Sequence, residues 1–321
     1  MFRQLSSFGR RFSTFVRCQS MATVPLELPK PQPIHFPTPK NPNVRFPLYD
    51  DELDQNKHNE LMNKIKMVVA TMRVKGGISI DYFSDVHVDI TSNVIPKINQ
   101  RSNILAFLGD AGKPTHPKFD EFVKMLSSMY KIVFFVPGNH EYGCTSIYDQ
   151  RKYDTYSPLL KETLSKYNNI VLMDNNTYML PNGVHVIGST MWTMPFFPDL
   201  TSNVLIRSTR HIEKHYADTN WLISQLNKNK QENIKTIVLS HMGPSFDMIS
   251  DEFKKFGCDS HSKFFNRYDF LLQYPVMAWL YGHTHTQNDK HVNNVFCSVS
   301  AHGHSWENGK KTEITPKVLT V

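Results

Sequence analysis

Residues 132–141 read Ile-Val-Phe-Phe-Val-Pro-Gly-Asn-His-Glu, an apolar run that turns polar within three residues. A short apolar run bounded by turn residues is typical of a buried strand. The Pro137-Gly138 pair predicts a tight turn, directly followed by the amide oxygen of Asn139 and the imidazole of His140. The stretch therefore predicts a buried strand whose carboxyl end presents polar, chemically active side chains.

Four other apolar runs end in the same way: residues 78–84 before Asp85 and His87, 104–108 before Asp110, 237–240 before His241, and 276–281 before His283 and His285. In open α/β sheets, ligands gather beyond the carboxyl ends of the strands, so five such ends can bring their donors into one small volume. The 25 residues from Asp85 to Asp110 and the 29 from Asp110 to Asn139 fit strand–helix–strand units of roughly 30 residues. The sequence thus predicts an α/β fold with a metal site at the strand ends.

The donor types in this set suit a metal cation. Asp85 and His87 are two apart in an extended segment, so their side chains point the same way and can bind one ion. Asp110 can bridge two ions with its two oxygens, and Asn139 can ligate through its amide oxygen. Three further imidazoles complete the set, at His241, His283 and His285. Neutral imidazoles and carboxylates suit zinc, iron, manganese or nickel, and two bridged ions lie ~3.5–4 Å apart in enzymes that displace at phosphorus.

Five ordered strings carry a resemblance to a known family: Ser84-Asp85-Val86-His87, Gly109-Asp110, Gly138-Asn139-His140-Glu141, Ser240-His241 and Gly282-His283-Thr284-His285. Together they resemble the calcineurin-like metallophosphoesterase superfamily, over residues 78–304. The flanking residues 188–192 and 306–308 are similar to those of a branch of small, poorly characterised phosphoesterases. The resemblance implies a four-layer α-β-β-α sandwich of two mixed sheets flanked by helices. It also implies two ion sites, with Asp85, His87 and His285 on one ion, Asn139, His241 and His283 on the other, and Asp110 as the bridge.

The activity that we expect is hydrolysis of a phosphate ester by a metal-bridging hydroxide, which two cations make acidic enough to form. His140 points away from the ligand Asn139, so it is free to act on the substrate as a general acid or a phosphate-binding donor. The catalytic residues are thus His140 and Asp110. Monoester and diester substrates both stay open, because the loops 142–157 and 195–208 would set the selectivity.

The chain departs from the protein serine/threonine phosphatases at two places. Those enzymes carry an aspartate and an arginine shortly after the Gly-Asp motif and an arginine before Gly-Asn-His-Glu, whereas residues 111–113 here are Ala-Gly-Lys and residues 136–137 are Val-Pro. The departure argues against a phosphoprotein phosphatase of that class, and it leaves open which group orients His140.

Two alternatives to a small-molecule phosphoesterase remain. The first is a non-catalytic interaction module on the same fold, although such a module usually loses ligands or the histidine after asparagine, and all eight residues are present here.

The second alternative is a nuclease. The net charge of +7 falls to +3 without residues 1–24, which hold four arginines and no acid. A body so close to neutral has no obvious electrostatic footprint for a polyanion, so we expect no nucleic-acid partner.

The N-terminal part of the chain stands outside the fold prediction. The basic leader, residues 1–24, is rich in arginine, serine and phenylalanine, which is typical of a transit peptide and predicts a mitochondrial location. A disordered basic tail, or a start at Met21 and a cytoplasmic location, are the alternatives. Residues 25–50 hold eight prolines and predict an extended linker. Residues 51–321 form the predicted catalytic domain, with a first helix over 51–73 and a core over 78–304.

Other patterns predict further elements and several residues without a catalytic role. Helices are expected over 119–130, 157–167, 208–228 and 262–273, and further strands over 184–192 and 295–300. His211 and His215 are spaced for zinc on a helix, but the order does not match the metalloprotease motif, so we expect a solvent-facing helix. The pair His302 and His304 is expected to line the substrate site or to be structural. Tyr142 and Trp192 are expected to lie in the core, and the four cysteines are expected to be free. No segment is expected to span a membrane, since no apolar run approaches ~18 residues.

Overall fold

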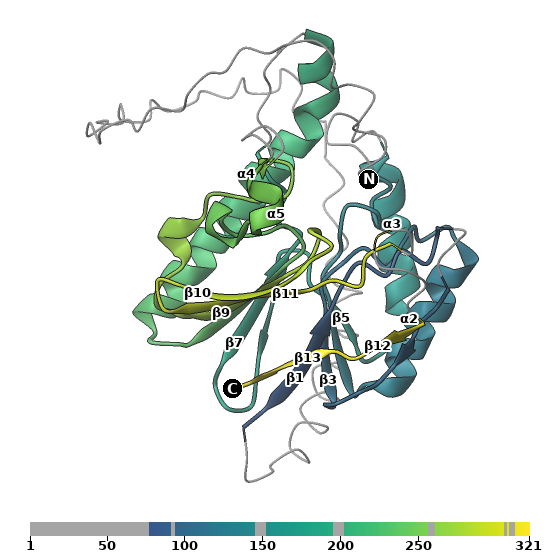
Figure 1. Ribbon diagram of the computed structural model, residues 1–321, viewed down its shortest axis with the longest axis horizontal. Helices are drawn as coiled ribbons and strands as arrows, with labels where there is room; N and C mark the ends of the chain where they lie inside the picture. Colours follow the sequence, from purple (N-terminus) through teal and green to yellow (C-terminus); the bar gives the residue numbers. More distant parts are fainter. Residues whose placement is uncertain are drawn as a thin grey trace, which may run out of the picture. The chain divides into compact units, whose positions relative to one another are not determined.

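The computed structural model describes residues 77–90, 94–144, 152–194, 202–255, 261–304, 307 and 312–321, with the side chains of 202–208, 252 and 253 left out (Figure 1). The chain divides into two compact units, residues 1–51 and 52–321, and every described residue belongs to the second. The leader, the proline-rich linker and the helix over 51–73 lie outside the described residues, so these three stay predictions.

The first sheet is built from four parallel strands and one antiparallel strand, in the order β13-β1-β3-β4-β5. The parallel strands are β1 (Ser79–Phe83), β3 (Ile104–Phe107), β4 (Ile132–Phe135) and β5 (Ile170–Leu172), and the antiparallel strand is β13 (Lys317–Thr320). Every residue of β3 and β4 is buried. Because both faces of a central parallel strand are covered, these strands are continuous apolar runs rather than alternating ones.

The second sheet has the order β10-β11-β9-β8-β7-β6 and is also mixed. Its parallel strands are β7 (His185–Ser189), β8 (Thr236–Ser240), β9 (Val276–Tyr281) and β11 (Val295–Ser300), and its antiparallel edge strands are β6 (Asn176–Met179) and β10 (Gln287–Val292). A separate parallel pair is formed by β2 (Lys97–Ile98) and β12 (Glu313–Ile314).

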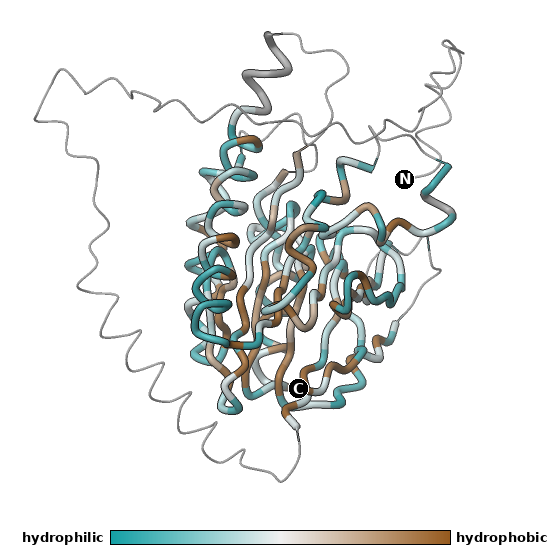
Figure 2. Tube along the Cα trace, turned by 90° about the vertical axis from the view of Figure 1, so that its left-hand side faces the viewer, coloured by the Kyte–Doolittle hydropathy of each residue, from teal (hydrophilic) through white to brown (hydrophobic). Residues whose placement is uncertain are grey.

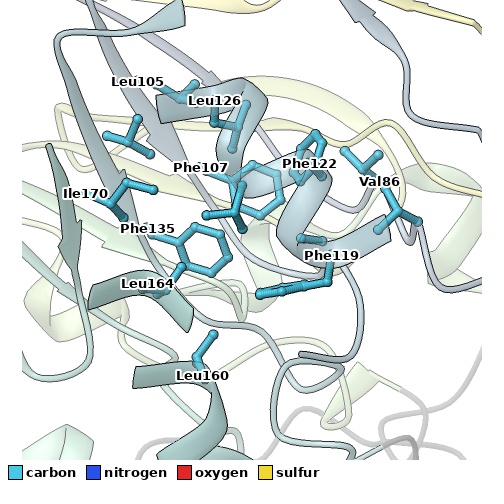
Figure 3. Packing of buried hydrophobic residues seen from close by; sticks show 14 of the residues in the cluster. Val86, Leu105, Phe107, Phe119, Phe122, Leu126, Phe135, Leu160, Leu164 and Ile170 are labelled. Carbon is cyan, nitrogen blue, oxygen red and sulfur yellow. The ribbon is translucent and has the colours of Figure 1, made fainter. Parts of the chain in front are cut away.

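The two sheets pack face to face, and helices cover their outer faces. Tyr82 and Phe134 of the first sheet share one core cluster with Leu239 and Leu280 of the second. The helices α2 (Pro117–Met129) and α3 (Tyr153–Ser165) pack on the outer face of the first sheet, where Phe107 and Phe135 meet Phe119, Phe122, Leu160 and Leu164 (Figure 3). The helix α4 (Ser202–Gln231) covers the outer face of the second sheet with Leu222 and Leu226. The predicted four-layer α-β-β-α arrangement is therefore confirmed.

The helices follow local chemistry. In α2, Pro117 occupies the first turn, where a missing N–H costs nothing, and the side chain of His116 accepts a hydrogen bond from the Lys118 amide. Figure 2 shows the hydrophobic colour concentrated on the strands of the interior. No helix in the described part of the chain is both long enough and apolar enough to cross a bilayer.

Two predicted elements differ from the structure. The helix expected over 262–273 is wrong, since this segment forms turns and the short 3-10 helix η2 (Asp269–Leu271). Its backbone bonds to the loop after β8 instead, where Gly243 accepts from the Asn266 amide at 2.8 Å and donates to Phe264 at 2.9 Å. The strand expected over 184–192 ends at Ser189. Two residues later, the amide of Met191 donates to the buried carboxylate of Asp218 at 3.1 Å instead of to a neighbouring strand. The remaining short elements are η1 (Phe246–Met248) and α5 (Asp251–Lys254).

The carboxyl ends of strands from both sheets meet at one edge. The Asp85 amide after β1 donates to Gly109 after β3 at 2.9 Å, within the first sheet. Across the sheets, a side chain at Gly282, after β9, would lie only 2.7 Å from the carbonyl of Leu108. The segments that carry the predicted donors therefore converge.

Candidate metal centre

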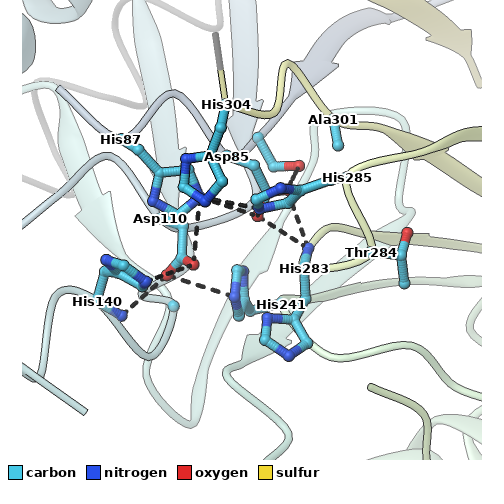
Figure 4. A network of polar contacts seen from close by, with 12 residues as sticks. Asp85, His87, Asp110, His140, His241, His283, Thr284, His285, Ala301 and His304 are labelled. Atoms are coloured by element: carbon cyan, nitrogen blue, oxygen red, sulfur yellow. Dashed lines mark hydrogen bonds and ion pairs between the residues drawn. The ribbon is translucent and has the colours of Figure 1, made fainter. Parts of the chain in front are cut away.

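The structure brings all seven predicted ligands to this edge, with Asn139 beside His241. Figure 4 labels the others, Asp85, His87, Asp110, His241, His283 and His285. Around the first half, the Nε2 atoms of His87 and His285 are 3.0 Å apart, and His285 Nε2 is 3.4 Å from Asp85 Oδ1. Around the second half, His241 Nε2 lies 3.2 Å from the Asn139 amide oxygen. The side chains of Asp85, His87 and His241 are almost fully buried. Nitrogen and oxygen donors thus surround a small volume whose walls are largely buried.

Asp110 stands between the two halves. Its Oδ2 is 3.8 Å from His87 Nε2, and its Oδ1 is 3.4 Å from His241 Nε2. Two overlapping groups of side chains that could hold a metal share this carboxylate: Asp110 with His87 and His140, and Asp110 with His241 and His283. One oxygen thus faces each half, as a bridging carboxylate requires.

The candidate ligands have unusual backbone conformations. Positive φ angles occur at Asp85 (61°), His87 (49°), Asp110 (58°), His283 (66°) and His285 (52°). Among the described non-glycine residues, the others with positive φ are four asparagines, which tolerate this region, and Met191. Such strain persists only where surrounding structure enforces it, and it clusters at functional sites. The turns after the strands therefore hold these donors in place at a conformational cost.

Two glycines allow the turns to approach each other. Gly109 has a φ of 91°, and a side chain there would lie 2.5 Å from His241 Nδ1 and 2.7 Å from the amide of Gly138. A side chain at Gly138 would lie 2.7 Å from the Asp110 amide. Neither position has room for a larger residue, so both glycines are required for the donors to converge.

Glu141 joins two of the ligand-bearing turns, a role that the sequence reasoning missed. Its carboxylate is fully buried and accepts four backbone amides: Asp110 at 2.9 Å and Gly138 at 2.7 Å through Oε2, and Ala111 at 2.6 Å and Gly112 at 3.2 Å through Oε1. Burial and the nearby charge of Asp110 raise the pKa of Glu141 to about 8. The only sequence signal was its place beside His140, which gives no sign that it reaches back to the Gly-Asp turn.

The candidate imidazoles of His241, His283 and His285 have an oxygen acceptor on the ring nitrogen that faces outward. His241 Nδ1 lies 2.8 Å from the carbonyl of Leu108, His283 Nε2 lies 3.3 Å from the carbonyl of Lys263, and His285 Nδ1 lies 2.7 Å from Glu307 Oε2. An acceptor there keeps the proton on the outer nitrogen and leaves the lone pair on the inner one. Metal-ligating histidines almost always have such a partner.

The charge balance of the site favours a cation. Burial alone would raise the pKa of Asp110, but the imidazoles of His241 and His140 outweigh it and hold the pKa well below its usual range. Burial lowers the pKa of His241 and of His285, yet Asp110 raises the first to about 9, and Asp85 with Glu307 raises the second to about 10. Without a metal, protons on these imidazoles balance the carboxylates, which is the balance that metal cations would supply.

His140 lies beside the carboxylate bridge. Its amide donates to Asp110 Oδ1 at 2.9 Å, and its Nε2 is 3.9 Å from Asp110 Oδ2. Its ring meets the ring of His87 edge to face at 4.5 Å. The side chain is 18% exposed, whereas that of His87 is 1% exposed. Its Nδ1 has no hydrogen-bond partner in the described part of the chain, so no carboxylate there orients it.

His304 is closer to the metal cluster than the sequence suggested. Its ring centroid lies 4.3 Å from that of His87 and 4.6 Å from that of His285, and the three form a further group that could hold a metal. The signal that could have identified it is its position after β11, where another apolar run ends near a histidine.

The expectation of a solvent-facing helix at His211 and His215 is wrong. His211 is buried, and its Nε2 donates to the carbonyl of Thr193 at 2.6 Å, while His215 Nδ1 donates to the carbonyl of Trp192 at 2.7 Å. Both histidines lie on the side of α4 that faces the loop after β7, an environment that helical spacing alone does not reveal. The core assignment of Tyr142 and Trp192 is confirmed, and so is a free, buried cysteine at Cys297. Cys144 is buried as well, with its Sγ 3.3 Å from the carbonyl of Tyr142.

Comparisons with known proteins agree with this geometry. The family described as calcineurin-like phosphoesterase matches residues 78–287. An uncharacterised protein of Acanthamoeba polyphaga mimivirus is 31% identical over 234 residues, which cover 63% of this chain and 79% of that protein. The crystal structure of phosphopantetheinyl hydrolase from Mycobacterium tuberculosis is similar with a TM-score of 0.53 at 14% identity, over 77% of this chain and 97% of that one. At this identity, the structural likeness shows a shared fold.

Proposed function

We propose that this chain, which belongs to the calcineurin-like phosphoesterase family, hydrolyses phosphate esters of small molecules with two metal ions. The observation that carries the proposal is the arrangement of His241, His283 and His285. Each has an oxygen acceptor on its outer ring nitrogen. His241 Nε2 and His285 Nε2 each lie 3.4 Å from a carboxylate oxygen of the site, and His283 belongs with Asp110 and His241 to a group that could hold a metal.

The donor set fits two ions of the zinc, iron, manganese or nickel class. One ion would be held by Asp85, His87 and His285, the other by Asn139, His241 and His283, and Asp110 would bridge them. Glu141 would hold the Asp110 and Gly138 turns at the spacing that the bridge needs. When bound, the ions activate water as the nucleophile and neutralise the charge that develops on the phosphoryl group.

His140 would act on the leaving group. Its Nε2 faces the bridge carboxylate at 3.9 Å, and its side chain is open enough to solvent for a substrate to reach it. A protonated imidazole there can donate a hydrogen bond or a proton to the departing oxygen. His304, on the other side of His87, would line the substrate.

Substitution of His140 separates its role from metal binding. Variant His140→Ala should lose roughly 10²–10⁴-fold in turnover, the range of general acid–base catalysis, while it keeps two ions per chain by elemental analysis. Variant His291→Ala, at an exposed histidine of β10, is the matched control and should keep both turnover and metal. Loss of both ions from His140→Ala would instead make this histidine a ligand.

An assay with two simple substrates tests the function itself. With Mn²⁺ present, the chain should hydrolyse para-nitrophenyl phosphate, its bis-ester, or both, and the ratio of the two rates shows whether monoesters or diesters are preferred. Variant Asp110→Asn should abolish both rates. A protein that binds two ions but hydrolyses neither substrate would favour a binding role, and a protein that binds none would overturn the proposal.

A further inference from the structure

Glu307 reaches a candidate ligand from outside the family-matched region, which ends at residue 287. Its Oε2 accepts the His285 ring N–H at 2.7 Å and the amide of His304 at 2.9 Å. The side chain is 14% exposed, so water screens the contact only partly. Glu307 therefore holds both the ring of a candidate ligand and the backbone that carries a further site histidine.

Residues 302 and 303, shortly before Glu307, are bonded to the first half of the site. The amide of His302 donates to the carbonyl of Ser84 at 2.9 Å, and the amide of Gly303 donates to that of Asp85 at 3.0 Å. These bonds run along the residues that directly follow β1, the strand whose end supplies Asp85 and His87. The amide of Glu307 also donates to the carbonyl of His304 at 3.0 Å, so backbone contacts connect Glu307 to this half of the site.

The outer acceptors differ in charge between the two halves. His285, in the first half, has a carboxylate partner, whereas His241 and His283, in the second half, have the neutral carbonyls of Leu108 and Lys263. A hydrogen bond to a carboxylate is roughly twice as strong as one between neutral groups, and it makes the imidazole a stronger donor. The structure is thus asymmetric in the strength of its candidate ligands.

We propose that Glu307 is a positioning residue that strengthens His285 as a ligand and makes the first half of the centre, with Asp85, His87 and His285, the tighter of two unequal ion sites. The inference rests on the proposed two-ion function. It concerns the order of filling, so that one ion binds to the first half before the second half is occupied.

Metal titration tests this inference. The metal-free full chain is titrated with Zn²⁺ or Co²⁺, and binding is monitored by calorimetry and by the Co²⁺ absorption spectrum. The titration should show two ions that bind with unequal affinity. Variant Glu307→Ala should weaken the tighter ion by about 10- to 100-fold and leave the weaker one unchanged. Variant Glu307→Gln keeps an acceptor without the charge and should lose less. Variant Glu313→Ala, at an exposed glutamate of β12, is the matched control.

A double-mutant cycle with His285 separates positioning from a general loss of structure. In the His285→Ala background, Glu307→Ala should have little further effect on either ion, because its target is gone. An equal loss in both backgrounds, equal weakening of both ions, or no change in Glu307→Ala would overturn the inference while the two-ion function stands. A wild-type chain that binds no ion at all would overturn the proposed function itself.

Discussion

Substitution of Glu141 by glutamine tests how the ligand-bearing turns are held together. Each of its carboxylate oxygens accepts two backbone amides, Oε1 those of Ala111 and Gly112 and Oε2 those of Asp110 and Gly138. Glutamine has nearly the same shape but replaces one oxygen by an NH₂ group. In either orientation of the glutamine side chain, its NH₂ group faces two backbone N–H groups. Two buried backbone N–H groups therefore lose their acceptor.

The magnitude follows from that count. A buried donor left without a partner costs roughly 1–3 kcal/mol, so Glu141→Gln should lose roughly 2–6 kcal/mol of unfolding free energy. At roughly 2–4 °C per kcal/mol for a domain of this size, the melting temperature should fall by roughly 4–24 °C. The change is measured by urea unfolding monitored by circular dichroism, at a pH above the Glu141 pKa of about 8, where the group is a carboxylate. A chelator is present so that metal content does not differ.

The control for this experiment is Glu313→Gln, at a side chain that is 57% exposed. A surface substitution of this kind should stay within roughly 0.5 kcal/mol of wild type. If Glu141→Gln were as stable as Glu313→Gln, the four amide contacts would not hold the two turns together, and the reasoning about the site's support would be refuted.

Three further predictions concern protons and one hydroxyl. At pH 7 the metal-free chain should hold protons on His241 and His285, because their pKa values are raised to about 9 and about 10. Ion binding should therefore release about two protons and become tighter as pH rises, which calorimetry in two buffers of different ionisation enthalpy measures. Release of no proton would contradict this prediction. Burial lowers the pKa of His211 to about 4, below the unfolded value of about 6.5, so its stabilisation is present above about pH 6.5 and lost as pH falls through about 4. Unfolding across pH should therefore show roughly 3 kcal/mol of pH dependence that disappears in His211→Gln, and an unchanged slope would argue against a neutral, buried imidazole. Finally, the buried hydroxyl of Thr190 donates to the carbonyl of Pro137 at 2.7 Å. Thr190→Val should therefore lose roughly 1–3 kcal/mol of unfolding free energy in urea, whereas Thr190→Ser keeps the hydroxyl and should lose much less. Equal losses in the two variants would assign the effect to packing.

Much of the strand prediction was local and was confirmed by the structure in both sheets. The apolar runs at 104–108, 132–136 and 276–281 match β3, β4 and β9 to within a residue, because a strand buried on both faces needs an unbroken apolar run. The helix over 262–273 was wrong for the complementary reason. Its backbone bonds to the loop after β8, and these contacts from distant residues override a weak helical period.

The sequence by itself determined which donors exist and in which order they leave the strands, because strand ends, turns and donor types are written in short stretches of the chain. It also indicated the family, through five strings that are each only a few residues long.

Only the tertiary structure decided which groups stand behind those donors. That Glu307 meets His285, that Glu141 reaches the amides of the Gly-Asp turn, and that His211 is buried against Thr193 all depend on contacts across 18 to 31 residues. Side-chain periodicity fixes which face of an element is apolar, but the partner of that face is set by strand order and register, which no local pattern specifies.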